Sequence, residues 1–157
     1  MKLHMERNRQ VLLRDAGRDE NLIYTVQRAS SLPEAAGVYI FGRRFGGNFE
    51  ALYVGQARDN IRRRVSQQLK NLPLMLHLKK AKNGKRIILA GRFISKPGQQ
   101  EKKCLVLLER ALIRYFLSEG HDLVNIQGTR LKRHEITSKN PRFMVPKLMF
   151  VDRAKSG

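Results

Sequence analysis

The chain has 157 residues, of which 41% are apolar, enough for one domain with a single hydrophobic core. Recurrent apolar runs exclude intrinsic disorder, no apolar stretch approaches the ~20 residues of a membrane-spanning helix, and the charged N-terminus lacks the apolar region of a secretory signal. The formal net charge of +19 favours a nucleic-acid partner over a membrane surface, because neutralised phosphates release their condensed counterions. The lone Cys104 excludes an internal disulfide, so we expect a cytoplasmic protein associated with nucleic acid.

The N-terminal half is predicted to contain a β-hairpin. Residues 1–30 mix charges with short apolar patches, which predicts a helix followed by an irregular lead-in. After a turn at 31–34, two segments rich in β-forming residues, 37–41 and 51–55, predict strands. The glycine-rich stretch 42–48 joins them as a hairpin turn.

The second half adds helices and one more core strand. Apolar residues spaced four apart predict a helix over 59–70, and a short helix is expected over 74–82. Residues 86–94 predict a third strand and 101–119 the longest helix. The basic, turn-rich C-terminal part is expected to include a last strand within 144–151. This order of elements predicts a compact α+β domain.

Two tyrosines of the hairpin are expected to share one face. Side chains alternate along a strand, so Leu52 and Val54 share a face that Tyr53 opposes, and Tyr39 opposes its own aliphatic neighbours in the same way. If the aliphatic residues face one core, Tyr39 and Tyr53 lie opposite or diagonal to each other on the other face. Two ordinary strand aromatics would show the same geometry.

Two charged side chains stand out on the predicted helices. On a helical wheel, Arg64 lies at the edge of the buried stripe of 59–70, whereas Arg62 and Arg63 point away from it. Glu109 is the one acidic residue in the middle of an apolar helical face, where a carboxylate must be paired, metal-bound or protonated. A structural ion pair explains Glu109 as well as a divalent ion held against a phosphate does.

Five sequence elements, in order, resemble the GIY-YIG nuclease family. They are Gly37-Val38-Tyr39, Tyr53-Val54-Gly55, the run from Gln56 to Val65 that contains Arg64, Glu109 in a leucine-rich helix, and Asn125 after that helix. The resemblance covers residues 35–128. It is particularly close to the nuclease module of the bacterial excision-repair incision subunit and to the family's restriction and homing enzymes.

The resemblance implies a small three-stranded antiparallel sheet flanked by helices. The nuclease core would span residues 35–128, between an N-terminal extension, 1–34, and a basic C-terminal extension, 129–157, that packs on or near the core. The implied activity is hydrolysis of phosphodiester bonds with one Mg²⁺ or Mn²⁺ ion, which leaves 5′-phosphate and 3′-hydroxyl ends.

The resemblance also implies roles for individual residues. Tyr39 would orient or deprotonate the attacking water, and Tyr53 would shape the site around the water or the scissile phosphate. Arg64 would stabilise charge on the phosphate, Glu109 would bind the metal ion, and Asn125 would brace the site. Because a phenol is a weak base at neutral pH, Tyr39 needs nearby positive charge.

Three departures from the family pattern concern candidate site residues. The stretch from the second tripeptide to Arg64 is one residue longer, which leaves Arg63 as the alternative catalytic arginine. Gln56 stands where repair enzymes often carry lysine, and Gln68 stands where restriction and homing members place histidine. His77 is the candidate to replace that histidine, so Gln56, Arg63 and His77 are accessory candidates.

The predicted function is a metal-dependent DNA endonuclease. Its DNA could be double- or single-stranded, RNA stays open as a substrate, and the oligomeric state is undetermined. Basic side chains of the C-terminal extension are expected to bind backbone phosphates of the nucleic acid. The nucleic-acid-binding candidates are Arg58, Arg62, Arg130, Lys132, Arg133, Lys139 and Arg142. The alternatives are a catalytically inactive nucleic-acid-binding protein on the same fold and a structural RNA-binding protein, which explains the charge but not Glu109 beside two tyrosines.

Overall fold

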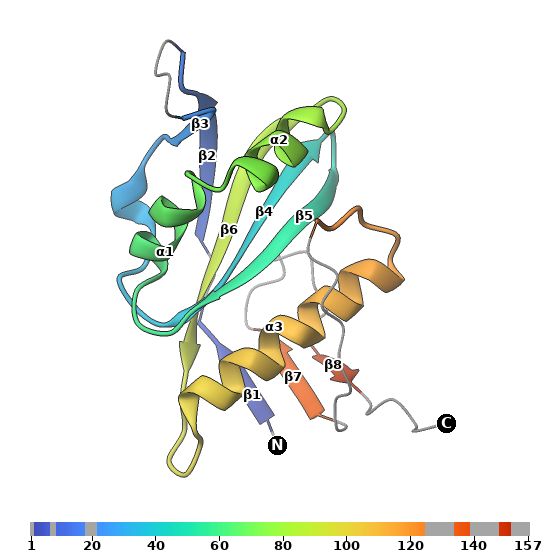
Figure 1. Ribbon diagram of the computed structural model, residues 1–157. Coiled ribbons are helices and arrows are strands. Elements are labelled where there is room, and N and C mark those ends of the chain that lie inside the picture. Colours follow the sequence, from blue (N-terminus) through green and yellow to red (C-terminus); the bar gives the residue numbers. More distant parts are fainter. Residues whose placement is uncertain (1, 7–8, 18–21, 125–133, 139–147, 152–157) are drawn as a thin grey trace.

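The computed structural model describes residues 2–6, 9–17, 22–124, 134–138 and 148–151. These residues form an α+β fold in which eight strands join into one sheet that is mostly antiparallel (Figure 1). The predicted α+β class is therefore confirmed. The sheet is larger than the expected three strands, because segments at both ends of the chain add to it.

Three antiparallel strands form the centre of the sheet. They are β4 (Gly37–Phe45), β5 (Asn48–Ala57) and β6 (Lys85–Ile94), and β4 lies between the other two. Tyr39 pairs with Gly55 of β5 on one side and with Ala90 of β6 on the other. Within the described part of the chain, β5 pairs with β4 alone, so its second edge is free for the packing of helices and of a site.

The first thirty residues contain strands instead of the predicted helix. One edge of β6 pairs with β4. The strands β1 (Lys2–Met5) and β2 (Arg9–Asp15) pair with different parts of its other edge, and β3 (Tyr24–Val26) pairs with β2. Val11 and Leu13 are buried on β2 with a period of two. Pairing with an existing strand edge overrides the weak helical pattern of this segment, because strand preference depends mainly on tertiary context.

The C-terminal strands continue the sheet beyond β1. The strand β7 (His134–Ser138) pairs with β1 in the parallel direction, and β8 (Leu148–Val151) pairs antiparallel with β7. The expected last strand is thus present over its final four residues, and residues 144–147 lie outside the described part.

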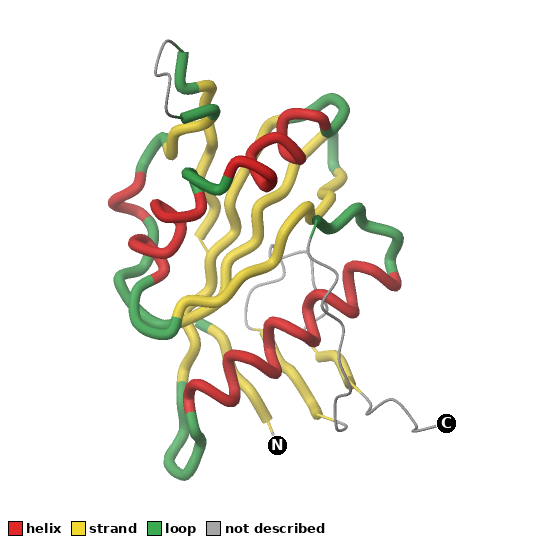
Figure 2. The backbone as a smooth tube through the Cα atoms, viewed as in Figure 1, coloured by secondary structure: helices red, strands yellow, loops and turns green. Residues whose placement is uncertain are grey.

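Helices cover both faces of the central strands (Figure 2). They are α1 (Ile61–Gln68), α2 (Leu72–Lys80) and α3 (Glu101–Ser118). A short 3₁₀ helix, η1 (Ala29–Ser31), precedes β4. On β4, Tyr39 and Phe41 pack with α1 and α2, whereas Val38 and Ile40 pack with α3. Successive residues of one strand therefore enter two different cores. No helix in the described ranges has both the length and the apolar composition needed to span a membrane.

A β-bulge in β5 changes the predicted alternation beside Tyr53. Ala51 and Tyr53 pair with adjacent residues of β4, so Leu52 has no partner residue on β4. Leu52 consequently packs in the core of α1 and α2, whereas Val54 packs in the core of α3. The prediction that Leu52 and Val54 share a face is wrong, since a bulge inserts one residue into a strand and shifts the alternation that follows.

Candidate active site

A cleft of about 440 Å³ lies at the free edge of β5. Side chains from β4, β5, α1, α3 and the loop between β5 and α1 line it. Seven predicted site residues line this cleft: Tyr39, Tyr53, Gln56, Arg58, Arg63, Arg64 and Glu109. The cleft therefore gathers candidates that are as far apart in the sequence as Tyr39 and Glu109.

The two tyrosines lie diagonally on neighbouring strands. The ring of Tyr39 stacks on that of Tyr53, with 6.2 Å between centroids and 29° between planes. Tyr39 is completely buried, and burial is the main cause that raises the pKa of both phenols. The diagonal arrangement expected from strand alternation is found, and both hydroxyls are held as neutral phenols at neutral pH in this substrate-free site.

The glycines of the two tripeptides permit this close packing. A Cβ at Gly55 would lie 2.5 Å from the Tyr39 hydroxyl oxygen, so the tyrosine ring rests directly on the β5 backbone. A Cβ at Gly37 would meet the carbonyl oxygen of Gly91 and would lie 2.8 Å from Cδ1 of Ile61. A larger residue at either position would push a neighbouring strand, α1 or the Tyr39 ring aside.

Gln68 joins the two tyrosine hydroxyls. Its Nε2 lies 3.1 Å from the hydroxyl oxygen of Tyr39 and 3.1 Å from that of Tyr53, and its side chain is buried. These hydrogen bonds lower the pKa of both phenols and oppose the larger effect of burial. In the sequence, Gln68 stands out only as a departure from the family pattern. A stronger signal was its place on the buried stripe of Ile61 and Val65, where an amide needs partners.

Glu109 faces an amide. Gln56 donates a hydrogen bond of 2.9 Å from Nε2 to Oε2 of Glu109, and burial raises the pKa of the carboxyl group. The hydrogen bond from Gln56 and the charges of Arg110 and Arg64 oppose that increase. Among the described residues, the hydrogen-bond partner of the carboxylate is thus an amide, and no ion pair of Glu109 is found within these residues.

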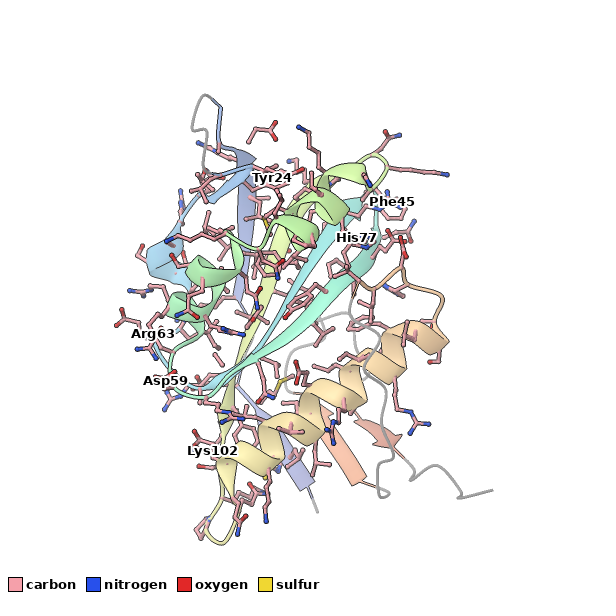
Figure 3. The ribbon with its side chains drawn as sticks, in the orientation of Figure 1. Tyr24, Phe45, Asp59, Arg63, His77 and Lys102 are labelled. Carbon is pink, nitrogen blue, oxygen red and sulfur yellow. The ribbon has the colours of Figure 1, made fainter. Side chains whose placement is uncertain are left out.

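Arg64 influences the site more than Arg63 does. The charge of Arg64 lowers the pKa of both tyrosines and of Glu109, and its guanidinium donates a hydrogen bond to Gln67. Arg63 forms an ion pair with Asp59 in solvent at the start of α1, where both are labelled in Figure 3. Both arginines line the cleft, and Arg64 is the one of the two whose charge lowers the pKa of other site residues.

Two candidates have structural contacts outside the cleft. Arg62 donates hydrogen bonds to the carbonyl groups of Ser30 and Leu32 and pairs with Glu34, so it ties α1 to the lead-in segment. His77 on α2 lies 2.7 Å from the carbonyl oxygen of Asp122, which connects α2 to the segment after α3. The remaining candidates lie outside the described residues: Asn125, Arg130, Lys132, Arg133, Lys139 and Arg142.

A second, basic cleft adjoins the candidate site. It has a volume of about 420 Å³, and its lining residues are Arg58, Lys102, Lys103, Val106, Leu107 and Arg110. Arg58 lines both clefts, and Lys102 is labelled at the start of α3 in Figure 3. Four cations without an acidic side chain line this cleft in the described structure, so a positive surface extends from the site onto α3.

A larger cleft, of about 830 Å³, lies against η1 and the start of α1. Glu6 and Glu34 line it together with three arginines, so its charges are mixed. Arg62, one of these arginines, already pairs with Glu34. This cleft has fewer features of a phosphate-binding surface than the smaller one on α3.

No family model, curated protein or solved structure matches the chain.

Proposed function

We propose that this protein is an endonuclease that hydrolyses phosphodiester bonds of DNA with one divalent metal ion. The observation that supports the proposal is the convergence of two tyrosines, an arginine and a glutamate from four separate elements in one cleft. These side chains also carry the resemblance to the GIY-YIG nucleases. A carboxylate held by an amide in a chain of charge +19 suits a metal ion placed between Glu109 and a phosphate.

The residues present fit one Mg²⁺ or Mn²⁺ ion. Glu109 is the carboxylate that would hold it, and Oε1 of Gln56 is a buried oxygen with no hydrogen-bond partner among the described residues. Both ions prefer oxygen ligands, and water and substrate phosphate commonly complete their coordination. The described residues contain no cluster of three or more His, Cys, Asp or Glu side chains, and Asp59, the other carboxylate that lines the cleft, pairs with Arg63. When bound, the ion supplies positive charge beside the reacting phosphate.

The tyrosines and the arginine would orient the reaction. Since burial keeps Tyr39 and Tyr53 neutral, both hydroxyls retain their protons; Tyr53, the less buried of the two, is suited to hold the attacking water by a hydrogen bond, and the completely buried Tyr39 lies behind it. Arg64 supplies positive charge to stabilise the phosphate during attack. Attack of water on phosphorus, with cleavage of the bond to the 3′ oxygen, would leave a 5′-phosphate and a 3′-hydroxyl, the latter taking up a proton.

The decisive experiment is cleavage by the full chain and by Glu109→Gln. Both proteins are incubated with double-stranded DNA, single-stranded DNA and RNA, with Mg²⁺, with Mn²⁺ and with chelator. We expect metal-dependent cuts by the wild type and none by Glu109→Gln, which keeps the shape of the side chain and an oxygen to accept the Gln56 hydrogen bond. Unchanged cleavage by Glu109→Gln would refute the proposal. Salt-dependent binding with no cleavage under any condition would favour an inactive nucleic-acid-binding protein, and preference for folded RNA would favour a structural RNA-binding protein.

The basic cleft on α3 offers a test of the substrate path. Changing Lys102 and Lys103 to glutamine should reduce the slope of log binding constant against log salt by about 2 units, because each phosphate contact contributes about 0.9. The matched control changes Lys79 and Lys80, two exposed lysines on α2, to glutamine. Equal effects of both pairs would show that net charge, and not this surface, determines binding.

A further inference from the structure

The amide of Gln68 lies at the end of a chain of hydrogen bonds that begins at α2. Asn71 is the N-cap residue of α2, and its Oδ1 accepts a hydrogen bond of 3.3 Å from the backbone N–H of Leu74. Nδ2 of Asn71 then lies 3.0 Å from Oε1 of Gln68. Nε2 of Gln68 in turn lies 3.1 Å from each tyrosine hydroxyl oxygen.

The direction of this chain follows from its first member. A backbone N–H can only donate, so the Asn71 atom that faces Leu74 must be the oxygen. The other end of the Asn71 amide is then an NH₂ group, and the Gln68 atom that it meets must be an oxygen. The NH₂ group of Gln68 therefore points at the tyrosines. The amide orientation, which hydrogen-bond networks usually decide, is here determined by a helix cap.

This direction determines what the tyrosine hydroxyls can do. An amide NH₂ group has two protons and no acceptor, so the oxygens of Tyr39 and Tyr53 both accept from Gln68. Each phenol still has one O–H proton to donate, and the two hydroxyls lie beside each other at the cleft wall. Even if one hydroxyl donates to the other, one O–H proton remains for a group in the cleft.

We infer that Gln68, held by Asn71, is a positioning residue that donates one hydrogen bond to each tyrosine oxygen and so directs a tyrosine O–H proton into the cleft. This role rests on the proposed function, because its purpose is to orient the attacking water. Gln68 stabilises the ionised phenol over the neutral one but takes up no proton, since an amide does not titrate in water. The proton released by the water therefore leaves through another group.

The test follows each tyrosine separately by ¹⁹F NMR in the full chain labelled with fluorotyrosine, whose phenol is more acidic than that of tyrosine. The chain has four tyrosines, and replacing each with phenylalanine assigns its signal. Gln68→Met keeps the side-chain volume and removes both hydrogen bonds. We expect it to raise the midpoint of ionisation at positions 39 and 53 by about one to two pH units and to leave Tyr24 and Tyr115 unchanged.

A second variant keeps the inference testable if Gln68→Met folds poorly. Asn71→Asp preserves the cap acceptor for Leu74 but cannot donate to Gln68. The NH₂ group of Gln68 then turns to the new carboxylate and its oxygen faces the tyrosines, so we expect a shift in the same direction that is at least as large, together with a lower kcat and an unchanged KM for DNA. Unchanged ionisation at positions 39 and 53 in the folded variants would overturn the role of Gln68. Absence of cleavage by the wild type would instead overturn the proposed function, and the NMR titration would still decide the positioning role.

Discussion

The Tyr39 ring rests on the backbone of β5, and we expect this contact to hold the two tripeptides together in one site. Replacing Gly55 with alanine tests this expectation. A Cβ at this position would lie 2.5 Å from the Tyr39 hydroxyl oxygen and 2.7 Å from Cε2, closer than real side chains approach. The ring is fully buried and contacts the rings of Phe41 and Tyr53, with centroid distances of 5.9 and 6.2 Å. It can therefore retreat only by displacing its neighbours.

The expected cost follows from this confinement. An added methyl group in a filled core destabilises by about 1–3 kcal/mol. For a protein of this length, each kcal/mol lowers Tm by about 2–4 °C, so Gly55→Ala should lower Tm by about 2–12 °C. The displaced Tyr39 hydroxyl would also leave its place against Gln68. A shift of about 1 Å in a positioning group can cost about 100-fold in rate, so we expect cleavage to fall by about that factor.

Thermal unfolding and cleavage at a temperature where the variants are folded measure both effects. Gly47→Ala is the matched control, because no atom lies within 4 Å of its added Cβ and its φ is outside the left-handed region. It should change stability by less than about 0.5 kcal/mol. A double-mutant cycle with Tyr39→Leu identifies the cause, since removing the ring should remove most of the penalty. Wild-type stability of Gly55→Ala, or an equal penalty without the ring, would refute this explanation.

Two further predictions concern charged residues of the site. Arg64→Gln should reduce kcat by at least about tenfold, whereas Arg63→Gln should change it by less than about twofold, because Arg64 is the one of these two arginines whose charge lowers the pKa of the tyrosines and of Glu109. Equal losses in cleavage assays would contradict this assignment. Burial raises the pKa of Glu109, so the native protein holds more protons than the unfolded chain between the two pKa values, and the free energy of unfolding falls as pH rises through that window. Glu109→Gln should thus stabilise the protein at neutral pH and lose this advantage in acid, as urea unfolding at several pH values would show; a variant that is less stable throughout would contradict the sign.

Local sequence signals were sufficient for the central elements. The helix predicted over 59–70 is found as α1, and the strand predicted over 86–94 is found as β6. Hydrophobic periodicity, glycine turns and helix caps act over a few residues, so they are visible without the fold. The diagonal pair of Tyr39 and Tyr53 likewise follows from alternation in a hairpin.

Long-range pairing could not be read from the sequence. Residues of β1 and β2 form strands because an edge of β6 is free beside them, a condition set by residues about 80 positions away. The bulge at Leu52 depends on the register between two strands, which the identity of Leu52 does not reveal. Alternation alone therefore assigned that side chain to the wrong core.

The sequence by itself determined the central α+β elements, the positive charge and the types of side chain available for a phosphate site. Only the tertiary structure decided that Glu109 faces Gln56, that the charge of Arg64 lowers the pKa of both tyrosines, and that Gln68 joins their hydroxyls. The physical reason is that each of these contacts crosses between elements. Its existence depends on how α1 and α3 pack around the free edge of β5, which no local pattern specifies.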